Sequence, residues 1–452
     1  MKLSKHKLGE LIEVTRGASL SGQFYAEKGE LVRLTLGNFN MNGGGFKENT
    51  SKTDLYYTGT VKDEFILNKG DIITPLTEQS LGLLGTTARI PESGKYIQSQ
   101  DVALVKCKEG LLDPNFCYYL ISSSVVRQQL SAGAQQTKIR HTSPDKIKDC
   151  TAWVPELEVQ KRIGRILYDI DEKIALNRQI NDNLEAMAKQ LYDYWFVQFD
   201  FPNEEGKPYK SSGGAMVWSE KLKREIPQGW IASDHSDLFT IGNGQTIPQN
   251  EGLIPAYGGN GIVKMVEISN YPACIIIGRV GANCGSIHYS KVPCWVSDNA
   301  ISVCSKNDDW RPFLFYSLSL YNLSKNKGGS SQPLITHEVL KHLYFPMSEK
   351  HINQFCHIVN ELQNLIYSNQ QEILKLTKQR DELLPLLMNG QATVNYHLSV
   401  VNVVARLPFY RRLPIFMYCF ILLLLSRLSW YNKNVRLQEM GDVVKGVIKE
   451  VA

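Results

Sequence analysis

The chain has 452 residues with 43% hydrophobic and 21% charged side chains, which suits two or three globular domains with cores of their own. The net charge of +5 permits an acidic partner such as nucleic acid without requiring one, and the N-terminal stretch lacks the apolar core of a signal peptide. Nine cysteines without a secretory signal favour free thiols over a disulfide framework. We therefore expect a cytoplasmic protein.

Residues 1–157 are predicted to form a first domain of mixed α and β structure. Short β-rich runs occur at 31–36, 71–74 and 101–105, and a helix is expected near 114–130. The stretch 150–155 is typical of a last strand that ends at a proline. A long helix, at about 159–195, is expected to follow this domain.

A second long helix is predicted at about 351–387, and it repeats the apolar pattern of the first. The first seam runs from Ile163 to Trp195 and the second from Phe355 to Leu387, at a constant offset of 192 residues. The three-and-four spacing of both seams is typical of a coiled coil. The chain can therefore pair its own two helices.

One position in each seam is polar, and it is the same position, Asn177 and Asn369. A buried polar layer destabilises a coiled coil but fixes its register and orientation. In an antiparallel pair the two asparagines would meet at the centre, so we predict an Asn177–Asn369 contact. The alternative is a polar position that lies near solvent.

The remaining segments are a linker at 200–232, rich in Pro, Gly and Ser, and a second domain at 233–348. The second domain repeats the order of the first, with strands, a helix at about 312–323, a Gly-rich turn and a closing strand. Residues 99–105 correspond to 297–303, and residues 133–139 correspond to 329–335. The two domains otherwise differ in residue detail, whereas the helices agree closely.

Two further features need an interpretation. Cys274, Cys284, Cys294 and Cys304 lack the close pairing of zinc ligands, so we predict small buried residues on strands. The tail at 395–452 contains eleven apolar residues in a row, Ile415–Leu425, whereas a membrane span needs about 20. We expect this tail to have no counterpart in the functional core, with a membrane anchor as the alternative.

Several motifs around the helices resemble the S (specificity) subunit of type I restriction–modification systems. They are Leu191-Tyr-Asp-Tyr-Trp-Phe-Val-Gln-Phe-Asp-Phe-Pro202, Gly206-Lys-Pro-Tyr-Lys-Ser-Ser-Gly-Gly214, Ile226-Pro-Gln-Gly-Trp230, the stretch 155–163, and Arg380-Asp-Glu-Leu-Leu-Pro-Leu-Leu-Met-Asn-Gly-Gln391. The resemblance covers residues 1 to about 394 in full domain order. The domains themselves match that family only in layout.

The resemblance implies an α+β fold in which two mixed α/β target-recognition domains are separated by two long antiparallel helices that form an intramolecular coiled coil. The expected boundaries are 1–157 and 233–348 for the recognition domains, 158–199 and 349–394 for the spacer helices, and 200–232 for the linker. It also implies that each recognition domain reads one half of a bipartite sequence in double-stranded DNA. Methyltransferase (M) and restriction (R) subunits would be the protein partners. S-adenosylmethionine, ATP and Mg would serve those partners, with no cofactor bound by this chain.

The sequence lacks the motifs that catalysis on DNA would require. A methyltransferase that flips an amino-bearing base carries Asn/Asp-Pro-Pro-Tyr/Phe, and the nearest string here, Asp113-Pro-Asn-Phe116, lacks the second proline. Neither a Rossmann-type glycine fingerprint nor a P-loop is present. We therefore predict a non-catalytic specificity subunit. The alternatives are a membrane-tethered DNA-binding adaptor and a stand-alone DNA-modifying enzyme.

Candidate DNA-contacting residues are those whose side chains read base edges or bind phosphates. In the first domain they are Gln135, Gln136, Thr137, Lys138, Arg140 and His141, followed by the weaker candidates Arg16, Arg33, Asn38 and Asn40. In the second domain they are Lys325, Lys327, Ser330 and Gln332, followed by Asn243, Gln245, Asn260, Arg279 and Asn283. Solvated surface loops and ordinary turns are the alternative for all of them.

Overall fold

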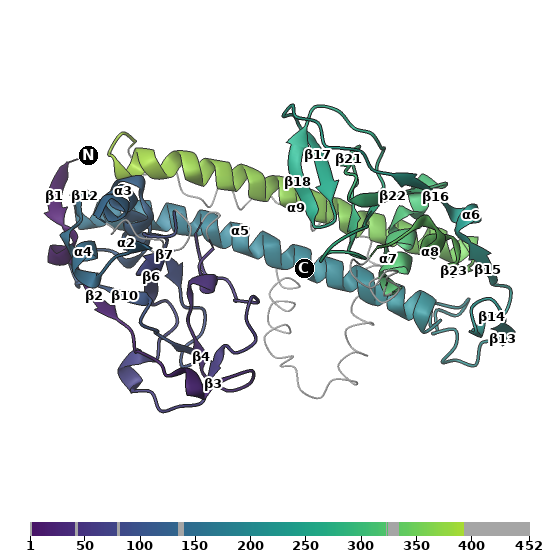
Figure 1. The fold of residues 1–452 in the computed structure, drawn as a ribbon, viewed down its shortest axis with the longest axis horizontal. Helices are drawn as coiled ribbons and strands as arrows, with labels where there is room; N and C mark the ends of the chain where they lie inside the picture. Colours follow the sequence, from purple (N-terminus) through teal and green to yellow (C-terminus); the bar gives the residue numbers. More distant parts are fainter. Residues whose placement is uncertain are drawn as a thin grey trace, which may run out of the picture. The chain divides into compact units, whose positions relative to one another are not determined.

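The computed structural model describes residues 2–40, 44–78, 82–133, 140–321, 323 and 334–392. The chain divides into two compact units, of which one comprises Met1–Asp169 together with the chain from Leu383 onward, and the other Ile170–Glu382. Both units mix helices and strands, as predicted (Figure 1). No helix in these described ranges is both long and apolar enough to cross a bilayer. The apolar run 415–425 lies outside them.

The first unit is built on a four-stranded antiparallel sheet in the order β2 (Ile12–Arg16), β10 (Val102–Cys107), β6 (Ile72–Pro75) and β8 (Ala88–Arg89). A second sheet has the order β3 (Tyr25–Ala26), β5 (Tyr56–Tyr57), β4 (Val32–Arg33) and β9 (Tyr96–Ile97), with β4 and β9 parallel. Two further antiparallel pairs are β1 (Leu3–Lys7) with β12 (Thr151–Pro155), and β7 (Thr77–Glu78) with β11 (Arg140–His141). The first four residues of the central strand β10 are buried, and all four are apolar.

The helices of the first unit share a core with this sheet, and two of them begin at side-chain caps. They are α1 (Leu8–Leu11), α2 (Pro114–Ser122), α3 (Ser124–Gly133), α4 (Pro144–Asp149) and the first part of α5 (Leu157–Tyr192). The Asp113 side chain accepts a hydrogen bond from the Phe116 N–H, and Pro114 occupies the first turn of α2. The Asp113-Pro-Asn-Phe116 string is therefore a helix start.

The second unit has a four-stranded antiparallel sheet in the order β16 (Phe239–Asn243), β22 (Ala300–Ser305), β19 (Ile275–Gly278) and β20 (Ile287–Tyr289). A smaller sheet has the order β18 (Gly261–Val266), β17 (Ile254–Gly258) and β21 (Trp295–Val296), and β15 (Ile231–Asp234) pairs with β23 (Tyr344–Met347). Its helices are α6 (His235–Leu238), α7 (Arg311–Leu320), α8 (His337–Lys341) and most of α9 (Glu349–Met388).

The two sheets share one topology, so the sequence correspondence between the domains reflects a repeated fold. β10 pairs with β2 and β6 as β22 pairs with β16 and β19, and Val102 lies opposite Pro75 where Ala300 lies opposite Gly278. This confirms the correspondence of 99–105 with 297–303. The correspondence of 133–139 with 329–335 was placed three residues off. The Thr142 N–H donates to the Leu76 carbonyl as the Ile335 N–H donates to the Arg279 carbonyl, so Ile335 corresponds to Thr142 and not to Ile139.

The two long helices extend almost as predicted, and most of their seam residues are buried. In the first unit Ile163 and Leu167 of α5 share a core with Leu387 and Met388 of α9. In the second unit Asn177 Nδ2 donates to Glu372 Oε2 at 2.9 Å, and Asn369 Nδ2 donates to Asn181 Oδ1 at 2.9 Å. The partners run in opposite directions along α5 and α9, so the helices are antiparallel in this unit.

The predicted Asn177–Asn369 contact is corrected by these hydrogen bonds. Both asparagines do form polar contacts between the helices, and Asn177 is buried. However, each bonds to a different residue, which shifts the register by about one helical turn relative to the prediction. Glu372 also accepts Lys173 Nζ at 2.5 Å, so the polar layer contains an ion pair that draws Asn177 away from Asn369.

The segment predicted as a loop-rich linker is more ordered than expected. It contains a hairpin, β13 (Met216–Ser219) with β14 (Arg224–Pro227), and β15 already begins at Ile231. A π-helical turn, Asp193–Val197, ends α5 and leads into an aromatic cluster in which Phe201 stacks on Trp230 and lies 4.1 Å from the His351 ring. Burial lowers the pKa of His351 to about 4.

Candidate nucleic-acid interface

In each domain, the chain that leaves the first sheet strand crosses closely over the segment that precedes the central strand. Ala18 forms a parallel bridge with Ser99, and Gln245 forms the equivalent bridge with Ser297. A Cβ on Gly17 would lie 2.2 Å from the Gln98 carbonyl oxygen. A Cβ on Gly244 would lie 1.7 Å from the Ser297 carbonyl oxygen. Only glycine fits at these two crossings. The close backbone contact at each crossing holds the neighbouring polar loops in place.

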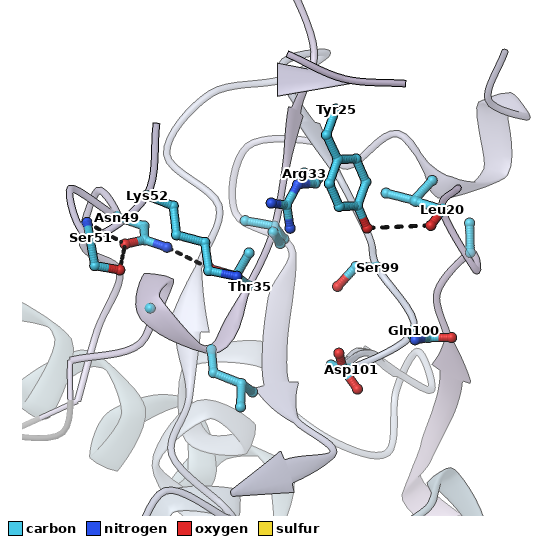
Figure 2. Close-up of a pocket in the computed structure, with 14 residues that line it drawn as sticks. Leu20, Tyr25, Arg33, Thr35, Asn49, Ser51, Lys52, Ser99, Gln100 and Asp101 are labelled. Carbon is cyan, nitrogen blue, oxygen red and sulfur yellow. Dashed lines mark hydrogen bonds between the residues drawn. The ribbon is translucent and has the colours of Figure 1, made fainter. Parts of the chain in front are cut away.

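Beside the crossing of the first domain lies a polar hollow of about 330 Å³ (Figure 2). Its lining includes Tyr25, Arg33, Lys52, Gln100 and Asp101. The Arg33 guanidinium lies 3.8 Å from the centre of the Tyr25 ring, and its Nη2 is 3.2 Å from Asp54 Oδ1. Arg33 is thus held in one position while it lines the hollow.

Two further candidates of this region, Arg16 and Asn38, differ in what they can do. Arg16 is exposed and donates from Nε to the Gln100 carbonyl at 3.0 Å, so it lies beside the same segment as Arg33. Asn38 is 2% exposed, accepts from the Thr35 N–H at 2.9 Å and donates to the Lys47 carbonyl at 3.2 Å. Asn38 is therefore a structural residue that caps a 3-10 turn, and its assignment as a DNA-contacting residue is corrected.

Arg140 and His141 lie on β11, paired with Glu78 and Thr77 of β7. Arg140 Nη1 is 3.2 Å from Glu78 Oε1, and its Nη2 also donates to the Ser131 carbonyl. Arg140 is thus engaged within the domain, whereas His141 is exposed. Gln135, Gln136, Thr137 and Lys138 lie outside the described residues.

In the second domain, Gln245 and Arg279 lie against residues 296–299. The Gln245 N–H donates to the Val296 carbonyl and the Arg279 N–H to the Asn299 carbonyl, each at 2.9 Å. Asn283 is exposed on the turn between β19 and β20. Burial, with the charge of Arg279 second, lowers the pKa of His337, which stands beside this turn. Lys325, Lys327, Ser330 and Gln332 lie outside the described residues.

The cysteines of the second domain are packed in its core. Cys274, Cys284 and Cys294 are buried, as predicted, while Cys304 is half-buried. Of these four, Cys304 alone lies within a strand, β22, so the predicted strand positions are wrong for the other three. The spacing of ten residues did not reveal that the Cys274 and Cys294 sulfurs lie 3.6 Å apart. Hydrogen bonding with Cys294 and Cys304, together with burial, raises the pKa of Cys274. Within the described ranges, no group of three His, Cys, Asp or Glu side chains is arranged to hold a metal ion.

Sequence reasoning missed two residues that organise the first domain. Glu78 is buried and binds Arg140, and Tyr25 supports Arg33. Neither residue belongs to a motif. Glu78 and Arg140 are far apart in sequence, and Tyr25 and Arg33 are separated by a turn, so no local sequence pattern distinguished Glu78 or Tyr25.

The sequence of the chain matches one known protein family over most of its length. The family model described as "Type I restriction modification DNA specificity domain" matches residues 2–186 and 227–383, which is more than half of the chain. The chain belongs to this family. It is thus the non-catalytic, DNA-recognising subunit of a type I restriction–modification system, and the absence of methyltransferase and P-loop motifs agrees with that.

Individual relatives agree with this assignment. The chain is 24% identical over 316 residues to the type I restriction enzyme MjaIX specificity subunit of Methanocaldococcus jannaschii, which covers 64% of this chain and 71% of that protein. A putative MjaX specificity subunit of the same organism is 23% identical over 384 residues, covering 76% and 85%. The crystal structure of the S subunit from M. genitalium matches with a TM-score of 0.57 at 18% identity, covering 86% and 96%, which supports the fold.

Proposed function

We propose that the two domains are target-recognition domains that each read one half of a bipartite DNA sequence, separated by an antiparallel coiled coil of α5 and α9. The observation that carries this proposal is the repetition of one sheet topology in two domains whose loops differ. Two copies of one scaffold can bind the two halves of a DNA site in similar ways, and loops that differ between the copies can recognise two different half-site sequences.

The spacer half of the proposal is supported by the contacts between the helices. The antiparallel hydrogen bonds of Asn177 and Asn369 and the ion pair of Arg380 Nη1 with Asp171 Oδ1 at 2.9 Å hold α5 and α9 in one register. A helix of 36 residues is about 54 Å long at 1.5 Å per residue. That length exceeds one turn of B-DNA, about 34 Å, and so suits two half-sites separated by unread base pairs.

The proposed DNA-contacting segments are 325–332 and 135–141, apart from Arg140, which is paired with Glu78. They are supported by their place in the chain, because each leads into an equivalent strand contact, that of β11 in the first domain and that of Leu334 in the second. Both are rich in cations, amides and small polar groups, which bind phosphates and base edges. Arg16, Gln245 and Asn283 are exposed or partly free beside the two crossings and are proposed as secondary contacts.

The protein partners follow from the same proposal. Methyltransferase subunits would bring S-adenosylmethionine, and restriction subunits would bring ATP and Mg, to the DNA that this chain selects. We propose that the outer faces of α5 and α9 contact the methyltransferase subunits. Exposed apolar residues on these helices, such as Leu176 and Leu374 at 55% and 63% exposure, support an interface there.

The experiment that tests the proposal is co-expression of the chain with the methyltransferase subunit of its system, followed by sequencing of the methylated bases. One bipartite motif is expected, with two defined halves and an unread gap. Substituting either recognition domain with that of a relative should change one half and leave the other. Methylation of a continuous motif, or of none while the complex assembles, would refute the proposal.

A further inference from the structure

A buried carboxylate in the first domain holds an unusual number of partners. Glu78 ends β7 and is 2% exposed. Its Oε2 accepts hydrogen bonds from three successive backbone N–H groups, those of Gly82 at 3.1 Å, Leu83 at 2.9 Å and Leu84 at 3.0 Å. The chain therefore folds back around this single oxygen, in the way that an anion is held by a cluster of backbone donors.

The other oxygen of the same carboxylate is paired with a cation from a distant part of the sequence. Glu78 Oε1 lies 3.2 Å from Arg140 Nη1, and Arg140 also bonds to Ser131 Oγ at 3.1 Å. Glu78 thus connects residues 82–84 with Arg140. These are the described residues that follow segments 79–81 and 134–139 in sequence, and the second segment contains Gln135–Lys138.

The charge of Arg140 is neutralised by this arrangement. A cation already paired with a buried carboxylate has little left to offer a phosphate, so Arg140 acts inside the domain. Removing Glu78 would leave the buried N–H groups of Leu83 and Leu84, and the partly buried one of Gly82, without an acceptor, and Arg140 without its counter-ion. Residues 82–84 and Arg140 would then lose the contacts that hold them, because an unsatisfied buried polar group seeks water.

The second domain offers an internal comparison. Since Thr142 and Ile335 are equivalent, and Leu76 and Arg279 likewise, the position that matches Glu78 is Gly281. Gly281 has a φ of 74° and has no side chain to accept or donate. At this position the described part of the second domain therefore has no counterpart of the Glu78 carboxylate.

We propose that Glu78 is a positioning residue that sets the DNA specificity of the first recognition domain, by fixing residues 82–84 and Arg140, which follow segments 79–81 and 134–139 along the chain. This inference rests on the proposed function. It predicts an asymmetry, because loss of Glu78 should relax recognition of one half-site and leave the half-site of the second domain intact.

The test compares Glu78→Gln and Arg140→Gln with the wild type and with a control, Glu92→Gln. Glu92 is an exposed carboxylate of the same domain, 3.0 Å from Lys95 Nζ, and its substitution removes the same charge. Each variant is purified with its methyltransferase subunit. Binding is measured on the specific duplex, on duplexes altered in one half or the other, and on unrelated DNA, and thermal unfolding is recorded.

Glu78→Gln and Arg140→Gln should each weaken binding to the specific duplex by about tenfold, a typical effect of misplacing one base contact. Alterations in one half-site should then matter less, while alterations in the other should matter as in the wild type. Glu92→Gln should behave as the wild type. Unchanged discrimination at both halves, relaxed discrimination at both, or a lowered melting temperature alone would overturn the inference. A wild type that recognises no bipartite site would instead refute the proposed function.

Discussion

Replacing Glu372 by alanine should loosen the pairing of α5 and α9 around their polar layer. Glu372 accepts hydrogen bonds from Asn177 at 2.9 Å and Lys173 at 2.5 Å. Burial raises the pKa of Glu372, but these two hydrogen bonds, together with the charges of Lys173 and Lys375, outweigh it and hold the pKa below its usual range. Asn177 is only 6% exposed, so Glu372→Ala leaves its amide in a buried position without the acceptor.

An unsatisfied buried amide destabilises a protein by about 1–3 kcal/mol. A value of ~2 kcal/mol corresponds to about a 30-fold change in an equilibrium constant. Because the helices span two compact units, a single global unfolding energy is not the right measure. Amide hydrogen exchange of the peptides that cover 173–181 reports local opening directly, and we expect it to be about 30-fold faster in the variant.

The control is Glu382→Ala on the same helix. Its carboxylate is 3.9 Å from Lys378 Nζ and exposed, so its removal should change exchange by less than about threefold. A double variant, Asn177→Leu with Glu372→Leu, removes the buried amide together with its acceptor and leaves only Lys173 unpaired, so it should recover part of the protection lost in Glu372→Ala. Unchanged exchange at 173–181 in Glu372→Ala would show that the polar layer does not stabilise the helix pair.

Three further predictions concern the domains and their DNA contacts. The pKa of His351 is about 4 in the folded state, whereas the unfolded chain protonates it near 6.5. Its contribution to stability is therefore complete above about pH 6.5 and is lost as the pH falls toward 4. His351→Gln should reduce this loss in melting curves recorded between pH 7 and 4. Gly17→Ala and Gly244→Ala should each unfold their own domain at lower temperature, measured by calorimetry, because a Cβ collides with backbone at both crossings; melting at the wild-type temperature would contradict the crossing geometry. Lys325→Ala with Lys327→Ala should weaken DNA binding and reduce the slope of log affinity against log salt by up to about 2, with no change in melting temperature; an unchanged slope would exclude both lysines as phosphate contacts.

The regular parts of the fold were predictable from sequence because their signals are periodic. The long helices were placed within a few residues of α5 and α9, since their seams repeat over many turns. The central strands β10 and β22 were found through their buried apolar runs and the shared serine at 99 and 297.

What the sequence could not give was the pairing of polar side chains. Asn177 was matched with Asn369 by symmetry, but Asn177 instead donates to Glu372, which also pairs with Lys173. Asn38 was a candidate for DNA contact by residue type, and only its capping of the Thr35 turn shows that its amide is already used. Glu78 carries no signal because its partners at 82–84 and 140 come together only in the folded domain.

The contrast between Glu78 and Gly281 indicates how two copies of one fold can acquire different specificities. The sheets keep the same pairing, and the glycine crossings at 17 and 244 are retained because no other residue fits them. The anchors lie outside the four-stranded sheets and are free to differ, by an ion pair of Glu78 in the first domain and by a glycine turn in the second. Under the proposed role of Glu78, a change of anchor would alter specificity at one half-site while the other domain and the helices stay as they are.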